Sequence, residues 1–175
     1  MIANGSRELA LVLGGARSGK SRFAEGLLAR HAPPWLYVAT AEAGDAEMVT
    51  RIAAHKARRG TDWMTLEAPR DLAGALAEPG DRPVLVDCLT LWLSNLMLVD
   101  AAVDAEIARL EQALERARTP VVLVANEVGS GIVPDNALAR RFRDLQGQLN
   151  QRLAARADRV VLVVAGLPLF VKGAA

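Results

Sequence analysis

The sequence predicts an α/β fold in which helices cover a parallel sheet, and three observations lead to it. Short apolar or β-branched segments alternate with helical patterns along the whole chain. Of the 175 residues, 51% are hydrophobic but only 4% are aromatic, which is typical of a Val- and Leu-rich parallel sheet buried under helices. A glycine-rich loop joins the first predicted strand to the first predicted helix. We expect one domain over residues 1–175, because no repeat, low-complexity tract or linker divides the sequence.

The predicted elements follow one another in a regular order. Short apolar segments are predicted as strands at residues 9–13, 35–39, 84–87, 120–125 and 159–165, and residues 63–66 are a further strand candidate in charged surroundings. Helical patterns occupy residues 20–31, 45–58, 70–77, 89–99, 103–118 and 135–157. We expect Asp135 to cap the last of these helices. In such a sheet the loops at the carboxyl ends of the strands line the ligand crevice.

The glycine-rich loop has the complete G-x-x-x-x-G-K-S pattern of a triphosphate cradle, and its residues are Gly14, Gly15, Ala16, Arg17, Ser18, Gly19, Lys20 and Ser21. Glycines let successive N–H groups approach phosphate oxygens, and the helix start adds a partial positive charge. We expect Lys20 to reach the outer phosphates and the Ser21 hydroxyl to ligate Mg²⁺. The chain should therefore bind a nucleoside triphosphate with a metal. The loop contacts phosphates only, so it does not identify the base.

Two acidic residues follow predicted strands on the same edge of the sheet. Asp87 ends an apolar strand, where an acid beside the phosphate loop can hold the metal directly or through water. Taken alone, a strand-terminal Asp is more often a cap or a turn residue. Glu127 lies where a switch GTPase would carry the guanine-reading Asn-Lys-x-Asp, and that lysine and aspartate are absent. Glu127 is either a site residue or a loop cap.

His55 has two interpretations. It shares a helical face with Met48 and Ile52 by its spacing, which is typical of a histidine facing the core. Alternatively, its neutral imidazole is a nucleophile, with nearby cations to neutralise a phosphate during attack. Spacing alone favours the structural interpretation. A group of arginines, Arg140, Arg141, Arg143 and Arg152, is interpreted as a solvated helix face.

The charge balance and the single cysteine limit the partners and the compartment. Lys plus Arg (21) nearly cancels Asp plus Glu (20), so no overall basic field would hold nucleic acid. Cys88 cannot form an internal disulfide, and residues 1–10 show no signal-peptide pattern, which favours the cytoplasm. The longest apolar runs, 89–99 and 160–170, are about half the length of a membrane helix. We therefore expect no membrane-spanning segment.

Five separate segments match one family in order along the chain. They are Gly-Gly-Ala-Arg-Ser-Gly-Lys-Ser (14–21), Tyr-Val-Ala-Thr (37–40), Arg-Ile-x-x-His-Lys (51–56), Asn-Glu-Val-Gly-x-Gly-Ile-Val-Pro-x-Asn (126–136) and Asn-Gln-Arg-Leu-Ala (150–154). On these segments the chain resembles the bifunctional adenosylcobinamide kinase and adenosylcobinamide-phosphate guanylyltransferase of cobalamin biosynthesis. The resemblance covers essentially the whole chain.

The resemblance implies a two-step activity. Adenosylcobinamide is phosphorylated from ATP or GTP, and GMP is then transferred from GTP to that phosphate, giving adenosylcobinamide-GDP and pyrophosphate. His55 matches the histidine that becomes guanylylated. The other guanine-nucleotide contacts implied by position are Ala39, Thr40, Ala41, Lys56, Ala57, Arg58, Arg59, Glu67 and Asp87. Some relatives carry a second histidine where this chain has Ala54, and some have Glu where it has Asp87.

The resemblance also implies a P-loop NTPase-type three-layer fold, similar to the recombinase core, whose mostly parallel sheet has one antiparallel strand. It implies a homo-oligomer, with a trimer favoured. The apolar segment 91–97 could serve as core or as subunit interface.

Two other functions account for part of the pattern. A single-activity P-loop kinase for another small alcohol would explain the phosphate loop and Asp87 and would leave His55 structural. A regulatory GTP-binding module is disfavoured by the missing Asn-Lys-x-Asp.

Overall fold

The computed structural model describes residues 7–42, 44, 53, 60–77 and 79–174. Seven strands form one sheet in the order β3-β2-β4-β5-β1-β6-β7. Their bounds are β1 Leu9–Gly14, β2 Trp35–Ala39, β3 Trp63–Glu67, β4 Val84–Asp87, β5 Val121–Asn126, β6 Arg159–Val164 and β7 Leu167–Lys172. Neighbouring strands pair in parallel except β6 and β7, which are antiparallel. The predicted mostly parallel sheet with one antiparallel strand is confirmed.

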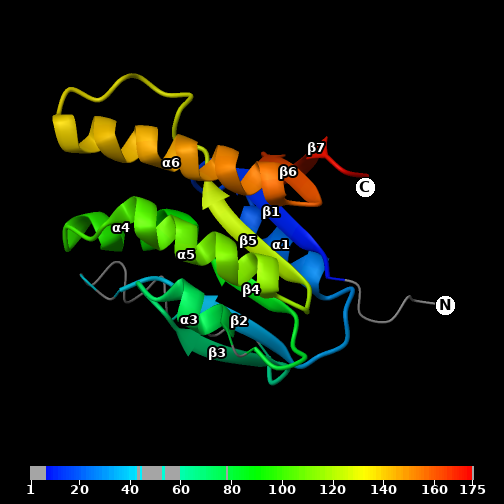
Figure 1. Ribbon diagram of the computed structural model, residues 1–175. Helices are drawn as coiled ribbons and strands as arrows, with labels where there is room; N and C mark the ends of the chain where they lie inside the picture. The colour runs from blue at the N-terminus through cyan, green and yellow to red at the C-terminus, as the bar shows by residue number, and fades with distance from the viewer. Residues whose placement is uncertain (1–6, 43, 45–52, 54–59, 78, 175) are drawn as a thin grey trace.

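Helices cover both faces of this sheet, so the molecule has three layers (Figure 1). Their bounds are α1 Lys20–Leu28, α3 Leu72–Ala77, α4 Leu89–Leu98, α5 Val103–Arg116 and α6 Ala137–Arg156. Strand residues alternate between the two cores. Leu9 and Leu11 of β1 pack with α4, α5 and α6, whereas Ala10 and Val12 pack with α1.

The apolar segment 91–97 belongs largely to the core. Trp92, Leu93 and Leu96 of α4 are almost fully buried within the chain itself. The subunit-interface alternative is therefore not needed to explain why these side chains are apolar.

The strand candidate at residues 63–66 is confirmed as β3, which lies at one end of the sheet. Most of its side chains are exposed, and this explains its charged surroundings. The sequence prediction missed β7. Ala165 and Gly166, both at positive φ, reverse the chain after β6 and send β7 back along it. Because all β7 side chains are exposed except the partly buried Phe170, the segment lacks the buried pattern that marks the central strands.

Several predicted helix ends shift by a few residues. The first helix ends at Leu28, and the last begins at Ala137. The expectation that Asp135 caps the last helix is wrong, because Asn136 Oδ1 accepts a hydrogen bond from Ala139 N at 2.7 Å. The predicted helix over residues 45–58 lies almost wholly outside the described residues.

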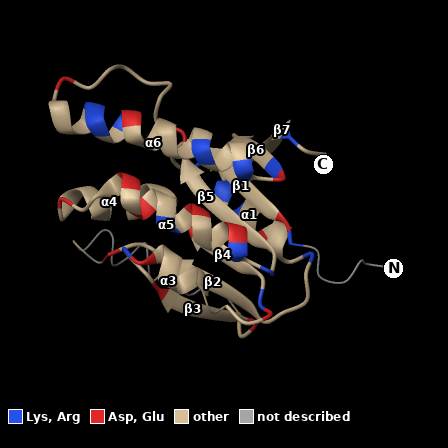
Figure 2. Ribbon diagram, viewed as in Figure 1, with Lys and Arg blue, Asp and Glu red and all other residues tan. Residues whose placement is uncertain are grey.

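Basic residues predominate along α6, whereas α5 carries more acidic than basic residues (Figure 2). The expectation that Arg152 is only solvated is wrong, since its guanidinium donates two hydrogen bonds to Glu111, at 2.9 and 2.6 Å. These bonds hold the pKa of the buried Glu111 carboxyl below its ordinary value. The pair therefore ties α5 to α6. Among the helices that the structure describes, none combines the length and apolarity needed to cross a membrane.

Candidate functional site

The phosphate loop occupies the turn from β1 into α1, and close packing requires two of its glycines, Gly14 and Gly19. A Cβ on Gly14 would lie 2.7 Å from Val163 O and would also meet Ser18 Oγ. Gly19 precedes α1 at φ 92°, and a Cβ there would lie 3.3 Å from Gly166 Cα. Gly166 N also donates to Ser18 O at 2.8 Å. The turn between β6 and β7 therefore supports the loop from behind.

The start of α1 has the features of an anion site. Gly19 offers no side chain to cap the helix, and no acidic residue lies in the first turn. Lys20 Nζ donates to Gly15 O at 3.1 Å, so this cation folds back across the loop. Ser18 Oγ is buried and has no hydrogen-bond partner among the described residues. These features fit a bound phosphate chain.

Three of the predicted nucleotide contacts lie in one row across the neighbouring strands. Ala39 of β2 is in register with Glu67 of β3 on one side and with Asp87 of β4 on the other. Since these strands are parallel and each ends at one of these residues, all three residues lie at the same edge of the sheet. Gly14 is in register with Asn126 of β5 at that edge. The fold thus brings together residues that lie up to 112 positions apart (Gly14 and Asn126).

Asp87 is oriented by Tyr37 of the neighbouring strand β2. The Tyr37 hydroxyl donates to Asp87 Oδ2 at 3.1 Å. Burial, and after it the negative charge of Asp87, raises the pKa of the Cys88 thiol from its ordinary 9.0 to about 11, while the Lys20 ammonium lowers it. The lysine of the phosphate loop therefore lies within electrostatic reach of the end of β4. Sequence reasoning did not identify Tyr37 as a site residue, although the residue pattern Tyr-Val-Ala-Thr contains it.

Thr40 is fully buried, and its hydroxyl bonds the protein itself. Thr40 Oγ1 donates to Cys88 O at 2.7 Å and accepts from Cys88 N at 2.8 Å. The hydroxyl of Thr40 is therefore fully engaged within the protein. Asn95 of α4, which sequence reasoning missed, donates from Nδ2 to Thr40 O at 2.8 Å and to Pro69 O at 3.0 Å. No motif marks Asn95, because its role depends on which backbone carbonyls the fold places around it.

Glu127 makes the loop-cap contact that is one of its two interpretations. Glu127 Oε1 accepts from Gly129 N at 2.6 Å, and the backbone N–H of Glu127 donates to Gly14 O at 3.1 Å. The side chain stabilises its own loop while the backbone contacts the start of the phosphate loop. A second buried threonine, Thr90, accepts from Asn126 N at 2.7 Å.

Several predicted site residues remain outside this geometry. The predicted nucleophile and the contacts that follow it, His55, Lys56, Ala57, Arg58 and Arg59, lie outside the described residues. Within the described part, no group of three or more His, Cys, Asp or Glu side chains could hold a metal alone. The hard oxygen atoms of Ser21 and Asp87 suit Mg²⁺, which takes few protein ligands and completes its shell with phosphates and water. They would serve only together with a nucleotide.

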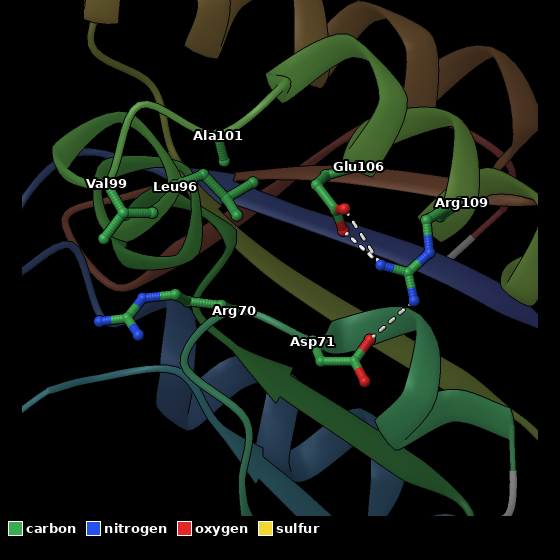
Figure 3. A pocket seen from close by; sticks show the side chains of 7 residues that line it. All are labelled: Arg70, Asp71, Leu96, Val99, Ala101, Glu106 and Arg109. Carbon is green, nitrogen blue, oxygen red and sulfur yellow. Dashed lines mark hydrogen bonds and ion pairs between the residues drawn. The ribbon is translucent and has the colours of Figure 1, made fainter.

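A cavity of about 230 Å³ lies beside this edge, between the start of α3 and the helices α4 and α5 (Figure 3). Leu96, Val99 and Ala101 line one side of it. On the other side, Arg109 bonds Glu106 at 2.9 and 3.0 Å and Asp71 at 3.1 Å, which ties α5 to α3. None of the seven lining residues comes from the phosphate loop or from the row of strand ends.

A family model described as "Cobinamide kinase / cobinamide phosphate guanyltransferase" matches residues 10–171. The chain belongs to this family. It is therefore one of a family of bifunctional enzymes that carry a kinase and a guanyltransferase activity, as the phosphate loop and the residue patterns at 37–40 and 126–136 predict.

Curated relatives of this family match nearly the full chain. One is the bifunctional adenosylcobalamin biosynthesis protein CobP of Pseudomonas aeruginosa, 51% identical over 168 residues that cover 93% of this chain and 96% of the relative. Another is the bifunctional adenosylcobalamin biosynthesis protein CobU of Salmonella typhimurium, 45% identical over 179 residues that cover 93% and 98%.

Solved structures of more distant proteins share the fold. An ATPase from the type III secretion system of pathogenic bacteria superposes with a TM-score of 0.55 at 11% identity, covering 93% of this chain and 56% of the ATPase chain. A KaiC-like protein from Pyrococcus horikoshii superposes with a TM-score of 0.53 at 13% identity, covering 89% and 71%. At such identities the likeness concerns the fold alone, which is the expected P-loop ATPase type.

Proposed function

We propose that the chain phosphorylates adenosylcobinamide with ATP or GTP and then transfers GMP from GTP to the product, giving adenosylcobinamide-GDP and pyrophosphate. The observation that carries the proposal is the uncapped, glycine-built phosphate loop beside the row of Ala39, Glu67 and Asp87, in a chain of the cobinamide kinase family. A single domain over residues 1–175 would perform both steps.

In the kinase step, the loop amides and Lys20 bind the outer phosphates of the donor. Lys20, drawn across the loop by Gly15 O, stabilises the charge that develops on the transferring phosphoryl group. Ser21 and Asp87 would hold Mg²⁺, which when bound neutralises phosphate charge. Tyr37 keeps one Asp87 oxygen in place for this role.

In the guanylyl step, His55 acts as the nucleophile. Its imidazole nitrogen attacks the α-phosphorus of GTP, a P–N bond forms, and the bond to the bridging oxygen breaks to release pyrophosphate. The phosphate of adenosylcobinamide phosphate then attacks the same phosphorus, and the P–N bond breaks to return free His55. Ala39, Thr40, Ala41, Lys56, Ala57, Arg58, Arg59, Glu67 and Asp87 form the surroundings of the guanine nucleotide.

Labelling with GTP that carries the label at the α-phosphate tests this division of roles. The protein should acquire a label that acid removes and base does not, as expected of a phosphoramidate. His55→Ala should lose the label and pyrophosphate release but keep at least part of the kinase step, because phosphoryl transfer needs positioning and charge neutralisation rather than a protein nucleophile. The other histidine of the chain provides a matched control, and His31→Ala should label normally.

Three results would contradict this division of roles. Normal labelling of His55→Ala would place the nucleophile on another residue. Absence of any acid-labile label on the folded wild-type protein would favour the single-activity P-loop kinase with a structural His55. Absence of pyrophosphate release together with absence of phosphoryl transfer would favour a regulatory nucleotide-binding module.

We also propose a cytoplasmic homo-oligomer, with a trimer favoured and without a nucleic-acid partner. An exposed apolar face on β6 and β7 supports the assembly. The residues Val164 and Leu167 pair across the two strands, as do Leu162 and Leu169, and the last strand offers a free edge within the described sheet. Light scattering of the purified protein measures the subunit number, and a monomer at micromolar concentration would contradict this part of the proposal.

A further inference from the structure

Two buried side chains hold the chain where β2, β3 and β4 end. The last ladder bond between β2 and β3 runs from Ala68 N to Ala39 O at 2.8 Å. Beyond it, the backbone groups of Thr40, Pro69 and Cys88 no longer pair within the sheet. Thr40 and Asn95 take over at this point, since their side chains bond four of these backbone groups, at 2.7 to 3.0 Å.

These bonds are costly to lose because both side chains are deeply buried. Thr40 is 0% exposed and Asn95 is 7% exposed. Removing the Thr40 hydroxyl would leave the N–H of Cys88 without that partner in a closed interior, whereas the Cys88 carbonyl would keep its hydrogen bond from Trp92 N at 3.2 Å. The chain would have to move to satisfy the N–H. Asp87 is the residue directly before Cys88, so such a movement would change the direction of its carboxylate.

We propose that Thr40 and Asn95 are a positioning pair that fixes the Asp87 carboxylate, through the backbone of Cys88, relative to the ends of β2 and β3. Tyr37 restrains Asp87 by a hydrogen bond to its carboxylate, whereas Thr40 restrains it through the backbone of the next residue, Cys88. Asn95 joins Thr40 to the end of β3, two residues past Glu67. The row of nucleotide contacts then moves as one unit. This inference rests on the proposed role of Asp87 toward Mg²⁺.

The chain offers a matched set of variants for a test. Thr40→Val keeps the shape of the side chain and removes its hydroxyl, whereas Thr40→Ser keeps the hydroxyl. Thr119→Val makes the same substitution at another buried threonine, two residues before β5, whose hydroxyl has no partner among the described residues. Asn95→Leu removes the amide of the second member. Asp87→Asn reports the direct role of the carboxylate.

Two measurements separate positioning from simple stability. Mg²⁺ affinity is measured by titrating the protein bound to a non-hydrolysable GTP analogue in a calorimeter, and the melting temperature is measured on the same samples. Thr40→Val and Asn95→Leu should weaken Mg²⁺ binding about tenfold, within the range known for groups that orient a metal ligand. Thr40→Ser should restore the affinity to within about threefold of wild type, and Thr119→Val should not change it.

Unchanged Mg²⁺ affinity in folded Thr40→Val, when Asp87→Asn weakens it, would overturn the positioning role and leave the role of Asp87 intact. Unchanged affinity in Asp87→Asn would reject the metal role of Asp87 and the positioning pair together. If Thr40→Val and Asn95→Leu both fail to fold while Thr119→Val folds, the milder Thr40→Cys variant decides, because its thiol is a weaker hydrogen-bonding group than the hydroxyl. Weakened Mg²⁺ binding in folded Thr40→Cys, with near wild-type binding in Thr40→Ser, would support the proposal. Wild-type binding in folded Thr40→Cys would assign the pair to stability alone.

Discussion

The two halves of the candidate site are built by different means. On the β1 side, backbone groups and glycines form the phosphate loop, and the supporting contact from Gly166 N to Ser18 O is also made by backbone. On the β2–β4 side, the side chains of Tyr37, Thr40 and Asn95 hold the strand ends. A backbone cradle needs particular residues at fixed spacing, whereas a side-chain network needs only that the fold place suitable partners together.

The largest effect should come from Lys20, the lysine of the backbone-built half. Lys20→Ala should lower the kinase turnover roughly 10³-fold, because it removes a charge aimed at the transferring phosphoryl group. The change is measured as kcat for phosphorylation of adenosylcobinamide, together with a melting curve. Lys172→Ala is the control, since Lys172 Nζ donates to Ala154 O and Ala155 O at the far end of α6. Unchanged turnover in folded Lys20→Ala would contradict the role of the loop.

Gly14 and Gly15 sharpen the comparison, because only one of the two neighbours is closely packed. Gly14→Ala should destabilise the fold by about 3 kcal/mol, since its Cβ would press on Val163 O and Ser18 Oγ. Gly15→Ala should cost much less, because no atom outside its chain neighbours lies within 4 Å of that Cβ. Urea unfolding of both variants gives the free energies. Equal losses would mean that packing around Gly14 is not what requires glycine.

The smallest effect concerns the side-chain-built half and depends on pH. Because the folded-state pKa of Cys88 is raised to about 11, the neutral thiol stabilises the fold fully below pH 9, and this contribution is lost as pH rises through 11. Between pH 8 and pH 10.5 the wild type should lose about 2 kcal/mol more than Cys88→Ala does. Urea unfolding of both proteins at the two pH values measures the difference. Parallel losses would show that the thiol titrates at its ordinary pKa.

The difference between the halves also explains which parts of the fold and of the candidate site could be predicted from the sequence. The phosphate loop, Asp87 and six strands were predicted from local patterns, and the family was predicted from five ordered segments. The role of Asn95 could not be predicted, since its two acceptors, Thr40 O and Pro69 O, lie 55 and 26 positions away in the sequence. The strand β7 was missed for a different reason, which is that its exposed side chains carry no pattern of burial. The roles of His55 and its neighbours stay a prediction.

The position of β1 in the sheet sets the time at which the site can form during synthesis. This strand is synthesised before the other described strands, yet it lies between β5 and β6, with Leu11 in register with Leu123 on one side and Val160 on the other. Pairing over such sequence distances is slow, because the loop must close before the contacts form. The phosphate loop, which follows β1, also needs the hydrogen bond from Gly166 N to Ser18 O, and Gly166 is synthesised 148 residues after Ser18. A nascent chain thus completes its nucleotide cradle only after Gly166 has been synthesised, so binding of a nucleotide reports a chain made at least to the end of β6.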